Sequence, residues 1–199
     1  MTLLERIPRE TFHEACIPVL ENKRLAMRAP RLGDAKTVAA LANDRRIAEN
    51  TARIPHPYKL SDAESFITGA NTPGGDTVFM ITLRDGSMLG ACGIVTQEPT
   101  PELGIWLGVP HWGQGYATEA LHAVIDYAFT DLGHEALQAG ARVTNPGSRR
   151  VLEKCGFQWT GVGLYRINAI KSSAPIDRFR LERGIWSAIK GWGRMKKVM

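Results

Sequence analysis

Two glycines near the middle of the chain stand just before a stretch with helical spacing. Gly113 and Gly115 lie in the segment VPHWGQGYATEAL, and the apolar residues that follow recur every three or four positions. A glycine-rich turn that leads from a strand into a helix gathers free backbone N–H groups at the positive end of the helix dipole. Glycine also allows positive φ and a close approach of the backbone to a ligand. The pattern is typical of a site for an anion such as phosphate.

The same pattern has a purely structural interpretation, because glycines beside a helix start are also ordinary connectors. Neither common nucleotide signature is present: the chain has no GxxxxGK[ST], and the spacing from Gly113 to Ala117 is not GxGxxG. From the loop alone, a phosphate site and a plain turn are equally well supported.

Hydrophobic periodicity and turn signals predict the elements that must position this loop. Their order is a strand, two or three helices, three strands, a helix, a strand, a helix and two strands, which indicates a mixed α/β fold. The predicted strands cover 24–29, 78–83, 88–96, 102–107, 136–143, 157–165 and 176–186. The turn Asp85-Gly86-Ser87 predicts that 78–83 and 88–96 form a β-hairpin. The predicted helices are one after Gly33, a short one opened by a capping box at 61–64, one that Gly133 ends, and one at 148–155.

Composition indicates one soluble domain. A chain of 199 residues that is 44% hydrophobic has enough apolar material for a sizeable core. No apolar run approaches the ~18 residues that span a bilayer, and the first twenty residues resemble neither a secretory signal nor a transit peptide. The three cysteines, Cys16, Cys92 and Cys155, form no CxxC pair. They favour reduced thiols in a cytoplasm and argue against a zinc site.

The net charge of +5 is concentrated at one end of the chain. Lys190, Arg194, Lys196 and Lys197 account for four of the five excess charges. A basic patch on the folded body is therefore not required, and a solvated tail is the favoured interpretation. Contact with nucleic acid or a ribosome through this tail is the alternative.

Two longer stretches decide between the interpretations of the loop. ELGIWLGVPHWGQGYATEAL, followed about thirty residues later by VTNPGSRRVLEKCGF, resembles the GNAT superfamily of acyl-coenzyme A N-acyltransferases, in particular its RimJ/RimL-type branch. The resemblance runs from the strand near Arg24 to about Trp186. It implies a mixed, mostly antiparallel sheet of six to seven strands, with helices on both faces and splayed fourth and fifth strands. It implies a single acyltransferase domain at 24–189, which leaves an N-terminal extension at 1–23 and the basic tail at 190–199.

The resemblance implies which residues hold coenzyme A. In the family, backbone amides of the loop after the fourth strand bind the pyrophosphate, and the pantetheine arm inserts between the splayed strands. Trp112 stands where the superfamily usually has Gln or Arg, and is expected to pack rather than to bind. The implied loop amides belong to Gly113, Gln114, Gly115, Tyr116, Ala117 and Thr118, and the implied pantetheine contacts are backbone groups of Ile105, Trp106, Leu107 and Val109. Asn145, followed by Pro146, is typical of a helix N-cap, and the family also places the matching Asn against the cofactor.

Acetyl transfer needs a neutral amine, a stabilised oxyanion and a protonated leaving thiolate. Many family members use a Tyr immediately before the Glu of the EKxGF segment as the acid, but that position here is Leu152. Ser148 lies one helical turn earlier on the same face, so its hydroxyl can point toward the same space. The RimJ/RimL-type branch is similar in placing a Ser there, and this resemblance implies that Ser148 protonates or hydrogen-bonds the sulfur. Helix capping is the alternative role for this serine. Glu102, at the start of the fourth predicted strand, is the candidate general base, acting directly or through water, and a solvated carboxylate is the alternative interpretation.

Other titratable residues have structural interpretations. Glu119 in the first turn of the helix complements the helix dipole. His56 and His111 titrate in a useful range, although a loop histidine is more often a bystander. Glu153 and Lys154 are expected to form a solvated pair.

The expected function is acetyl transfer from acetyl-coenzyme A to a primary amine, with a protein α-amino group favoured over a small-molecule amine. The segments 28–70 and 165–176 are expected to select this acceptor. A non-catalytic module that binds acyl-coenzyme A is the alternative, and the missing Tyr at Leu152 is its best support. The protein is expected to act without a metal, as a monomer or homodimer.

Overall fold

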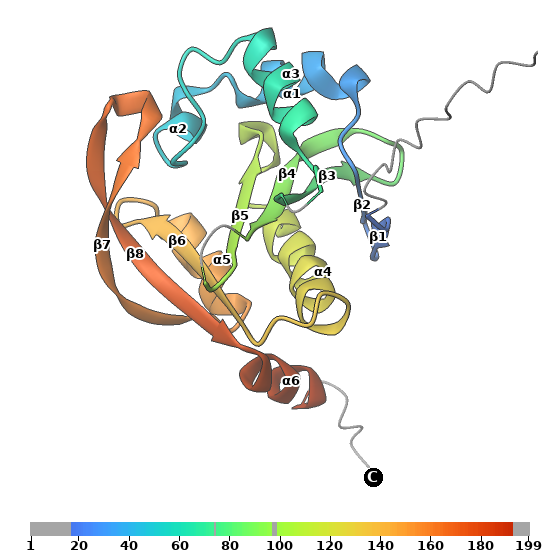
Figure 1. Ribbon diagram of the computed structural model, residues 1–199, viewed down its shortest axis with the longest axis vertical. Helices are drawn as coiled ribbons and strands as arrows, with labels where there is room; N and C mark the ends of the chain where they lie inside the picture. Colours follow the sequence, from blue (N-terminus) through green and yellow to red (C-terminus); the bar gives the residue numbers. More distant parts are fainter. Residues whose placement is uncertain (1–16, 74, 97–98, 193–199) are drawn as a thin grey trace, which may run out of the picture.

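The computed structural model describes residues 17–73, 75–96 and 99–192, and these fold around one eight-stranded sheet (Figure 1). The strands lie in the order β1-β2-β3-β4-β5-β6-β8-β7. They are β1 Leu20–Glu21, β2 Leu25–Arg28, β3 Thr77–Leu83, β4 Met88–Val95, β5 Glu102–Leu107, β6 Ala136–Arg142, β7 Gln158–Ile167 and β8 Ser172–Glu182. The helices are α1 Ala35–Ala42, α2 Arg45–Ala48, α3 Leu60–Gly69, α4 Tyr116–Thr130, α5 Pro146–Lys154 and α6 Arg183–Trp192, with short 3-10 turns at Leu32–Asp34, Val109–His111 and Asn168–Ile170.

The sheet opens between β5 and β6. All other neighbouring strands are antiparallel, whereas β5 and β6 run parallel and pair only where Glu102 lies opposite Gln138. The Gln138 N–H donates to the Pro101 carbonyl at 2.9 Å, and beyond this point the strands diverge. Figure 1 shows β6, β8 and β7 leaning away from the other strands. The splay expected between the fourth and fifth strands is confirmed. These strands are numbered β5 and β6 here because the short strand β1 adds one to the count.

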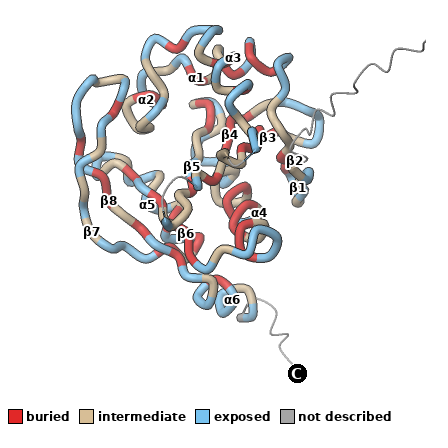
Figure 2. The backbone as a smooth tube through the Cα atoms, in the orientation of Figure 1, coloured by how far each residue is buried: buried red, intermediate tan, exposed pale blue. Residues whose placement is uncertain are grey.

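Helices cover both faces of the sheet, as expected. On one face α4 and α5 bury a core that includes Phe79 and Ile81 of β3 and Leu121 of α4. Figure 2 shows buried positions along α4 and the strands beside it. On the other face α1 and α3 pack against Met80 and Ala91. Successive strand residues point to opposite faces, so this alternation in β3 places the two cores on opposite sides of the sheet.

The expectation of six to seven strands was wrong by one short strand. Leu20 and Glu21 pair with Met27 and Ala26 of β2, so the sheet begins inside the segment expected as an N-terminal extension. Two paired residues are too short for a hydrophobic period to be seen in the sequence. The four-residue helix α2 was missed for the same reason.

The predicted last strand, 176–186, was wrong at both ends. β8 begins at Ser172 and ends at Glu182, and α6 then starts at Arg183. Trp186 of α6 is buried, and its indole N–H donates to the Asp126 carboxylate of α4 at 2.7 Å. Lys190 pairs with the same carboxylate at 2.7 Å, so the first residue of the expected basic tail belongs to a packed helix. The remaining tail residues lie outside the described part of the chain.

Two helix starts differ from their predictions. α3 begins at Leu60, and Asp62 Oδ2 accepts the Lys59 N–H at 2.7 Å, so the cap lies before the predicted box at 61–64. α5 begins at Pro146, two residues before the predicted span 148–155, and the N-cap predicted at Asn145 is confirmed. Within the described residues, no helix is long and apolar enough to cross a membrane.

Candidate active site

The glycine loop adopts the backbone that only glycine takes up readily. Gly113 has φ 74° and Gly115 has φ 82°, both in the left-handed region. Gly115 is the N-cap residue of α4 and has no side chain that could bond to the helix end. The N–H groups of Tyr116, Ala117 and Thr118 therefore have no partner within the helix and converge at its N-terminus. An anion is the ligand that this arrangement suits.

Arg24 of the segment before β2 fastens the loop to the sheet. Its Nε donates to Glu119 Oε2 at 2.6 Å, its backbone N–H donates to Glu119 Oε1 at 2.9 Å, and its Nη1 donates to the Gln114 carbonyl at 3.1 Å. Its guanidinium also lies 4.5 Å from the centre of the Tyr116 ring. Arg24 thus contacts the chain on both sides of Gly115. Its charge also offsets that of Glu119 at the helix N-terminus.

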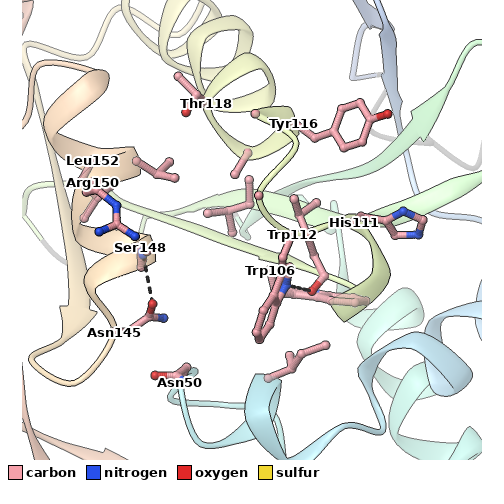
Figure 3. A pocket seen from close by; sticks show the side chains of 18 of the residues that line it. Asn50, Trp106, His111, Trp112, Tyr116, Thr118, Asn145, Ser148, Arg150 and Leu152 are labelled. Carbon is pink, nitrogen blue, oxygen red and sulfur yellow. Dashed lines mark hydrogen bonds between the residues drawn. The ribbon is translucent and has the colours of Figure 1, made fainter.

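A cavity of about 460 Å³ opens beside this loop, between β5, α4 and α5 (Figure 3). Val109 and Gln114 do not line it, and the Gln114 side chain instead donates to the Pro110 carbonyl at 2.9 Å. The cavity brings together most of the residues expected to hold coenzyme A: Ile105, Trp106, Leu107, Gly113, Gly115, Tyr116, Ala117, Thr118, Asn145 and Ser148.

Only alternate residues of β5 direct backbone groups into the splay. The Gly108 N–H donates to the Leu89 carbonyl at 2.8 Å, and the antiparallel ladder then turns Trp106 toward β4 as well. Ile105 and Leu107 therefore direct their N–H and carbonyl groups to the open side. The Trp112 indole N–H already donates to the Leu107 carbonyl at 2.8 Å (Figure 3), which gives the expected packing residue a defined place on the cavity wall.

Basic side chains that sequence reasoning missed also line this cavity. Arg46 of α2, and Arg150 and Lys154 of α5, stand on its walls. Glu153 pairs with Arg149 at 2.9 Å and not with Lys154, so the expected Glu153–Lys154 pair was wrong. Arg150 and Lys154 are four residues apart on one helix, a spacing that places both on the same face. This spacing in the sequence could have predicted that Arg150 and Lys154 lie on one face of α5.

The first turn of α5 presents Ser148 without using its hydroxyl for capping. Asn145 is the N-cap residue, and its Oδ1 accepts the Ser148 N–H at 3.0 Å (Figure 3). Among the described residues the Ser148 hydroxyl makes no hydrogen bond, so the capping interpretation of this side chain is not supported. Leu152, one turn later, is only 4% exposed and belongs to the apolar core.

A second cavity, of about 760 Å³, lies over the sheet on the side of α3. The two cavities meet at the opening between β5 and α5, where the same residues line both. These shared residues are Asn50, Thr51, Ile105, Trp106, Ser148 and Leu152. A molecule in one cavity can therefore reach a molecule in the other beside Ser148.

The larger cavity carries both acidic and basic side chains. Arg53 pairs with Asp76 at 2.9 Å, and Asp62 is occupied in capping α3. Glu102 lies near Gly140 at the point where β5 and β6 separate, and Arg142 lines the wall beyond it. Three carboxylates and two guanidinium groups thus face the same space.

Several polar atoms on the wall of this cavity are buried without a partner. They are Asn50 Oδ1, Asp76 Oδ1 and Arg142 Nε. A buried polar atom without a hydrogen bond is costly and is common at functional sites.

Two other side chains of the larger cavity are neutral at physiological pH. Burial, together with the charge of Asp62, raises the pKa of Tyr58 to about 12, so this phenol donates rather than accepts a proton. Burial raises the pKa of the Cys92 thiol to about 12 as well. Neither group can serve as the general base.

The segments expected to select the acceptor meet on the wall of the larger cavity. The Asn168 N–H donates to the Ala52 carbonyl at 3.0 Å, and Asn168 Nδ2 donates to the Arg53 carbonyl at 3.1 Å. Of the two candidate histidines, His111 lines the smaller cavity, whereas His56 lines neither.

Residues 24–158 match the acetyltransferase (GNAT) domain family. The chain belongs to this family. Among curated proteins, the uncharacterized N-acetyltransferase p20 of Bacillus licheniformis is 29% identical to this GNAT protein over 149 residues, which cover 72% of this chain and 84% of that protein.

Solved structures share the fold of this GNAT protein. RimJ of Mycobacterium smegmatis, in complex with CoA-disulfide, superimposes with a TM-score of 0.72 and is 21% identical, covering 85% of this chain and 90% of that chain. The spermidine N-acetyltransferase of Vibrio cholerae, in complex with CoA and spermine, superimposes with a TM-score of 0.72 and is 22% identical. The match covers 83% of this chain and 99% of that chain. The resemblance to the RimJ/RimL-type branch thus holds at the level of the fold.

Membership of the GNAT family makes this chain an N-acetyltransferase that depends on acetyl-coenzyme A. The smaller cavity fits that cosubstrate, because its free amides suit the pyrophosphate and its open β5 edge suits the two amides of pantetheine. The basic side chains on its walls, Arg46, Arg150 and Lys154, suit the phosphate of coenzyme A that lies outside the pyrophosphate. No group of His, Cys, Asp and Glu residues in the described part of the chain could hold a metal ion.

Proposed function

We propose that this GNAT protein transfers the acetyl group of acetyl-coenzyme A to a primary amine that enters through the larger cavity. One observation carries the proposal: the two cavities meet beside Ser148, between β5 and α5. A thioester held in the smaller cavity and an amine held in the larger cavity would be brought together there. Such positioning is a large part of catalysis in a reaction between two bound substrates.

The residues of the smaller cavity have separate roles in this proposal. The amides of Gly113 and of residues 115–118 hold the pyrophosphate, and Ile105 and Leu107 pair with pantetheine as an added strand. Asn145 acts chiefly by capping α5, because its Oδ1 accepts the Ser148 N–H. The cap keeps Ser148 at the junction of the two cavities.

The chemical step is a direct transfer. The neutral amine attacks the thioester carbonyl carbon, a C–N bond forms, and the C–S bond breaks as the tetrahedral intermediate collapses. The amine loses a proton to Glu102, directly or through water, and the departing thiolate accepts a hydrogen bond or proton from Ser148. Ser148 suits this role because its hydroxyl is not occupied by the helix cap.

A protein or peptide α-amino group is the favoured acceptor. The larger cavity, at about 760 Å³, has room for more than a small amine, and guanidinium groups on its wall suit peptide carbonyls. The carboxylates Asp62, Asp76 and Glu102 favour a second candidate, a polyamine such as the spermine found with the Vibrio cholerae structure. With acetyl-coenzyme A as cosubstrate and two buried free thiols, Cys92 and Cys155, we place the enzyme in the cytoplasm.

The experiment is thiol release from acetyl-coenzyme A in the presence of an amine panel. The panel contains short lysine-free peptides with free N-termini, the same peptides with blocked N-termini, and spermidine. We expect turnover with the free peptides and none with the blocked ones. Turnover with spermidine alone would favour the second candidate. If the protein binds coenzyme A and no amine raises turnover, it is a non-catalytic binding module.

A further inference from the structure

Gly104 is an exposed residue in the middle of an internal strand. β5 lies between β4 and β6 in the sheet, and positions on an internal strand are usually covered by side chains from neighbouring strands and helices. A Cβ atom built on Gly104 would meet no other atom within 4 Å. Glycine in a strand interior contributes no packing and loses more backbone entropy than other residues on folding. The local fold therefore gives no reason for a glycine here.

The space above Gly104 is the larger cavity. Gly104 lines that cavity together with its register partner on β4, Gly93, and with Gly140 on β6. Alternation along β5 places Glu102, Gly104 and Trp106 on the same face of the sheet. A side chain at position 104 would therefore project between the candidate general base and the side chain of Trp106.

Gly104 is also next to the junction of the two cavities. The following residues, Ile105 and Trp106, line both cavities. An amine that approaches the thioester from the larger cavity must pass over this part of β5. The atoms nearest to Gly104 would then be the nitrogen of the acceptor and the carbon that carries it.

We propose that Gly104 is a specificity-determining residue that makes room for a branched carbon beside the reacting amine. This inference rests on the proposed acetyl transfer and names its acceptor class: α-branched amines, such as the N-terminal residue of a peptide with a side chain. The carbon beside the α-amino group of an N-terminal residue other than glycine carries two carbon substituents, the carbonyl and the side chain. The corresponding carbon of an alkylamine or polyamine carries one carbon substituent and two hydrogens. The empty position above β5 matches the extra substituent.

The test pairs added volume on the enzyme with removed volume on the acceptor. Gly104→Ala and Gly104→Val are compared with the wild type on three acceptors: an alanyl peptide, a glycyl peptide of otherwise identical sequence, and propylamine. The control is Gly33→Ala, because a Cβ at Gly33 also meets no atom within 4 Å but Gly33 lines neither cavity. Thermal unfolding and the KM for acetyl-coenzyme A are measured for every variant.

We expect Gly104→Val to lower kcat/KM for the alanyl peptide at least tenfold more than for the glycyl peptide, with propylamine affected least. Gly104→Ala should show the same order of acceptors, with a smaller difference between the alanyl and glycyl peptides. In both variants the Tm should not fall, and the KM for acetyl-coenzyme A should not rise. An unchanged ratio between the alanyl and glycyl peptides would overturn the inference. So would a wild type that accepts only propylamine, although acetyl transfer itself would then stand. A wild type that accepts only spermidine also overturns the inference, and one that accepts neither these three amines nor spermidine overturns the proposed function instead.

Discussion

Arg24 and Glu119 are 95 residues apart in the chain, and their side chains form an ion pair of 2.6 Å beneath the glycine loop. The same guanidinium donates to the Gln114 carbonyl and lies over the Tyr116 ring. A carboxylate at the start of α4 stabilises the helix, yet it would also repel a bound pyrophosphate. Arg24 compensates that negative charge while it holds the loop, so the helix can keep its acidic first turn beside an anion site.

Arg24→Gln should weaken acetyl-coenzyme A binding, because the variant leaves the Glu119 charge uncompensated and frees the Gln114 carbonyl. We expect the KM for acetyl-coenzyme A to rise about tenfold, equivalent to about 1.4 kcal/mol, with little change in kcat. Steady-state kinetics with acetyl-coenzyme A as the varied substrate measure this difference. The double variant Arg24→Gln/Glu119→Gln should recover part of the loss.

Arg84→Gln is the matched control for this variant. Arg84 forms a similar surface pair with Glu21 at 2.8 Å, but its partners, Glu21 and the Asn22 carbonyl, are not part of the glycine loop or of α4. Its loss should leave the KM for acetyl-coenzyme A unchanged. If Arg24→Gln and Arg84→Gln behave alike, Arg24 has no role in positioning the loop.

Gly115→Ala should lose stability and cosubstrate binding together. Its φ of 82° places any L-residue in the left-handed region, at a cost of about 1–2 kcal/mol. Relaxation of that strain moves the amides of the loop away from the pyrophosphate. We expect a lower Tm and at least a tenfold weaker affinity for coenzyme A by calorimetry.

Gly86→Ala separates these two effects. Gly86 has φ 89° in the β3–β4 hairpin turn, and a Cβ there meets no atom within 4 Å, so this substitution carries the same strain away from both cavities. It should lower the Tm by a similar amount and leave coenzyme A affinity intact. Equal losses of affinity in both variants would count against the loop as the pyrophosphate site.

The sequence predicted local features better than distant contacts. The glycine loop, the β3–β4 hairpin and the Asn145 cap each depend on a few neighbouring residues, and the structure has all three. Arg24 could not be predicted, because nothing in the local pattern of a strand start indicates a partner 95 residues away. The larger cavity was equally hidden, since its walls come from segments that meet only in the folded chain.

The end of β8 shows why periodicity misjudged the C-terminal region. Arg178, Arg180 and Glu182 alternate with Phe179 and Leu181, which is a strand pattern, and the prediction extended this strand to Trp186. Tertiary contacts override this pattern. The ring centres of Trp186 and His122 are 5.3 Å apart, and the Trp186 indole N–H donates to Asp126; both partners lie on α4. Helical geometry is required for Lys190 to reach the same carboxylate.

Ser148→Ala should lower kcat with acetyl-coenzyme A at least tenfold and leave its KM nearly unchanged, because the hydroxyl is proposed to act on the departing sulfur. Stopped-flow or steady-state thiol release measures the effect. The Tm should not fall, since the cap of α5 comes from Asn145. Ser148→Thr, which restores a hydroxyl, should recover part of kcat.

Asn145→Ala provides the contrast for Ser148→Ala. Loss of the N-cap acceptor should destabilise the protein by about 1 kcal/mol, measured by urea unfolding. A Ser148→Ala variant that unfolds as easily as Asn145→Ala while keeping its kcat would return Ser148 to a structural role.

The two buried thiols should be unreactive in the folded protein. Burial raises the pKa of both Cys92 and Cys155 to about 12 from an ordinary value of 9.0, which lowers the thiolate fraction near pH 8 by about three orders of magnitude. In a Cys16→Ser variant, used because Cys16 lies outside the described residues, we expect iodoacetamide at pH 8 to modify neither thiol. Both should react in urea, as measured by mass spectrometry.

The same shift fixes the sign of a stability change with pH. Below about pH 9 both thiols are protonated in the folded and unfolded states, so they do not lower the free energy of unfolding. As the pH rises above that value the unfolded chain ionises first, and each thiol should lower the free energy of unfolding by up to ~1.4 kcal/mol per pH unit until its folded pKa is reached. Urea unfolding of the Cys16→Ser protein at pH 8 and pH 10 should show a lower midpoint at pH 10. The difference should shrink when Cys92 and Cys155 are both replaced by Ala. Rapid alkylation of the folded protein at pH 8 would contradict both expectations.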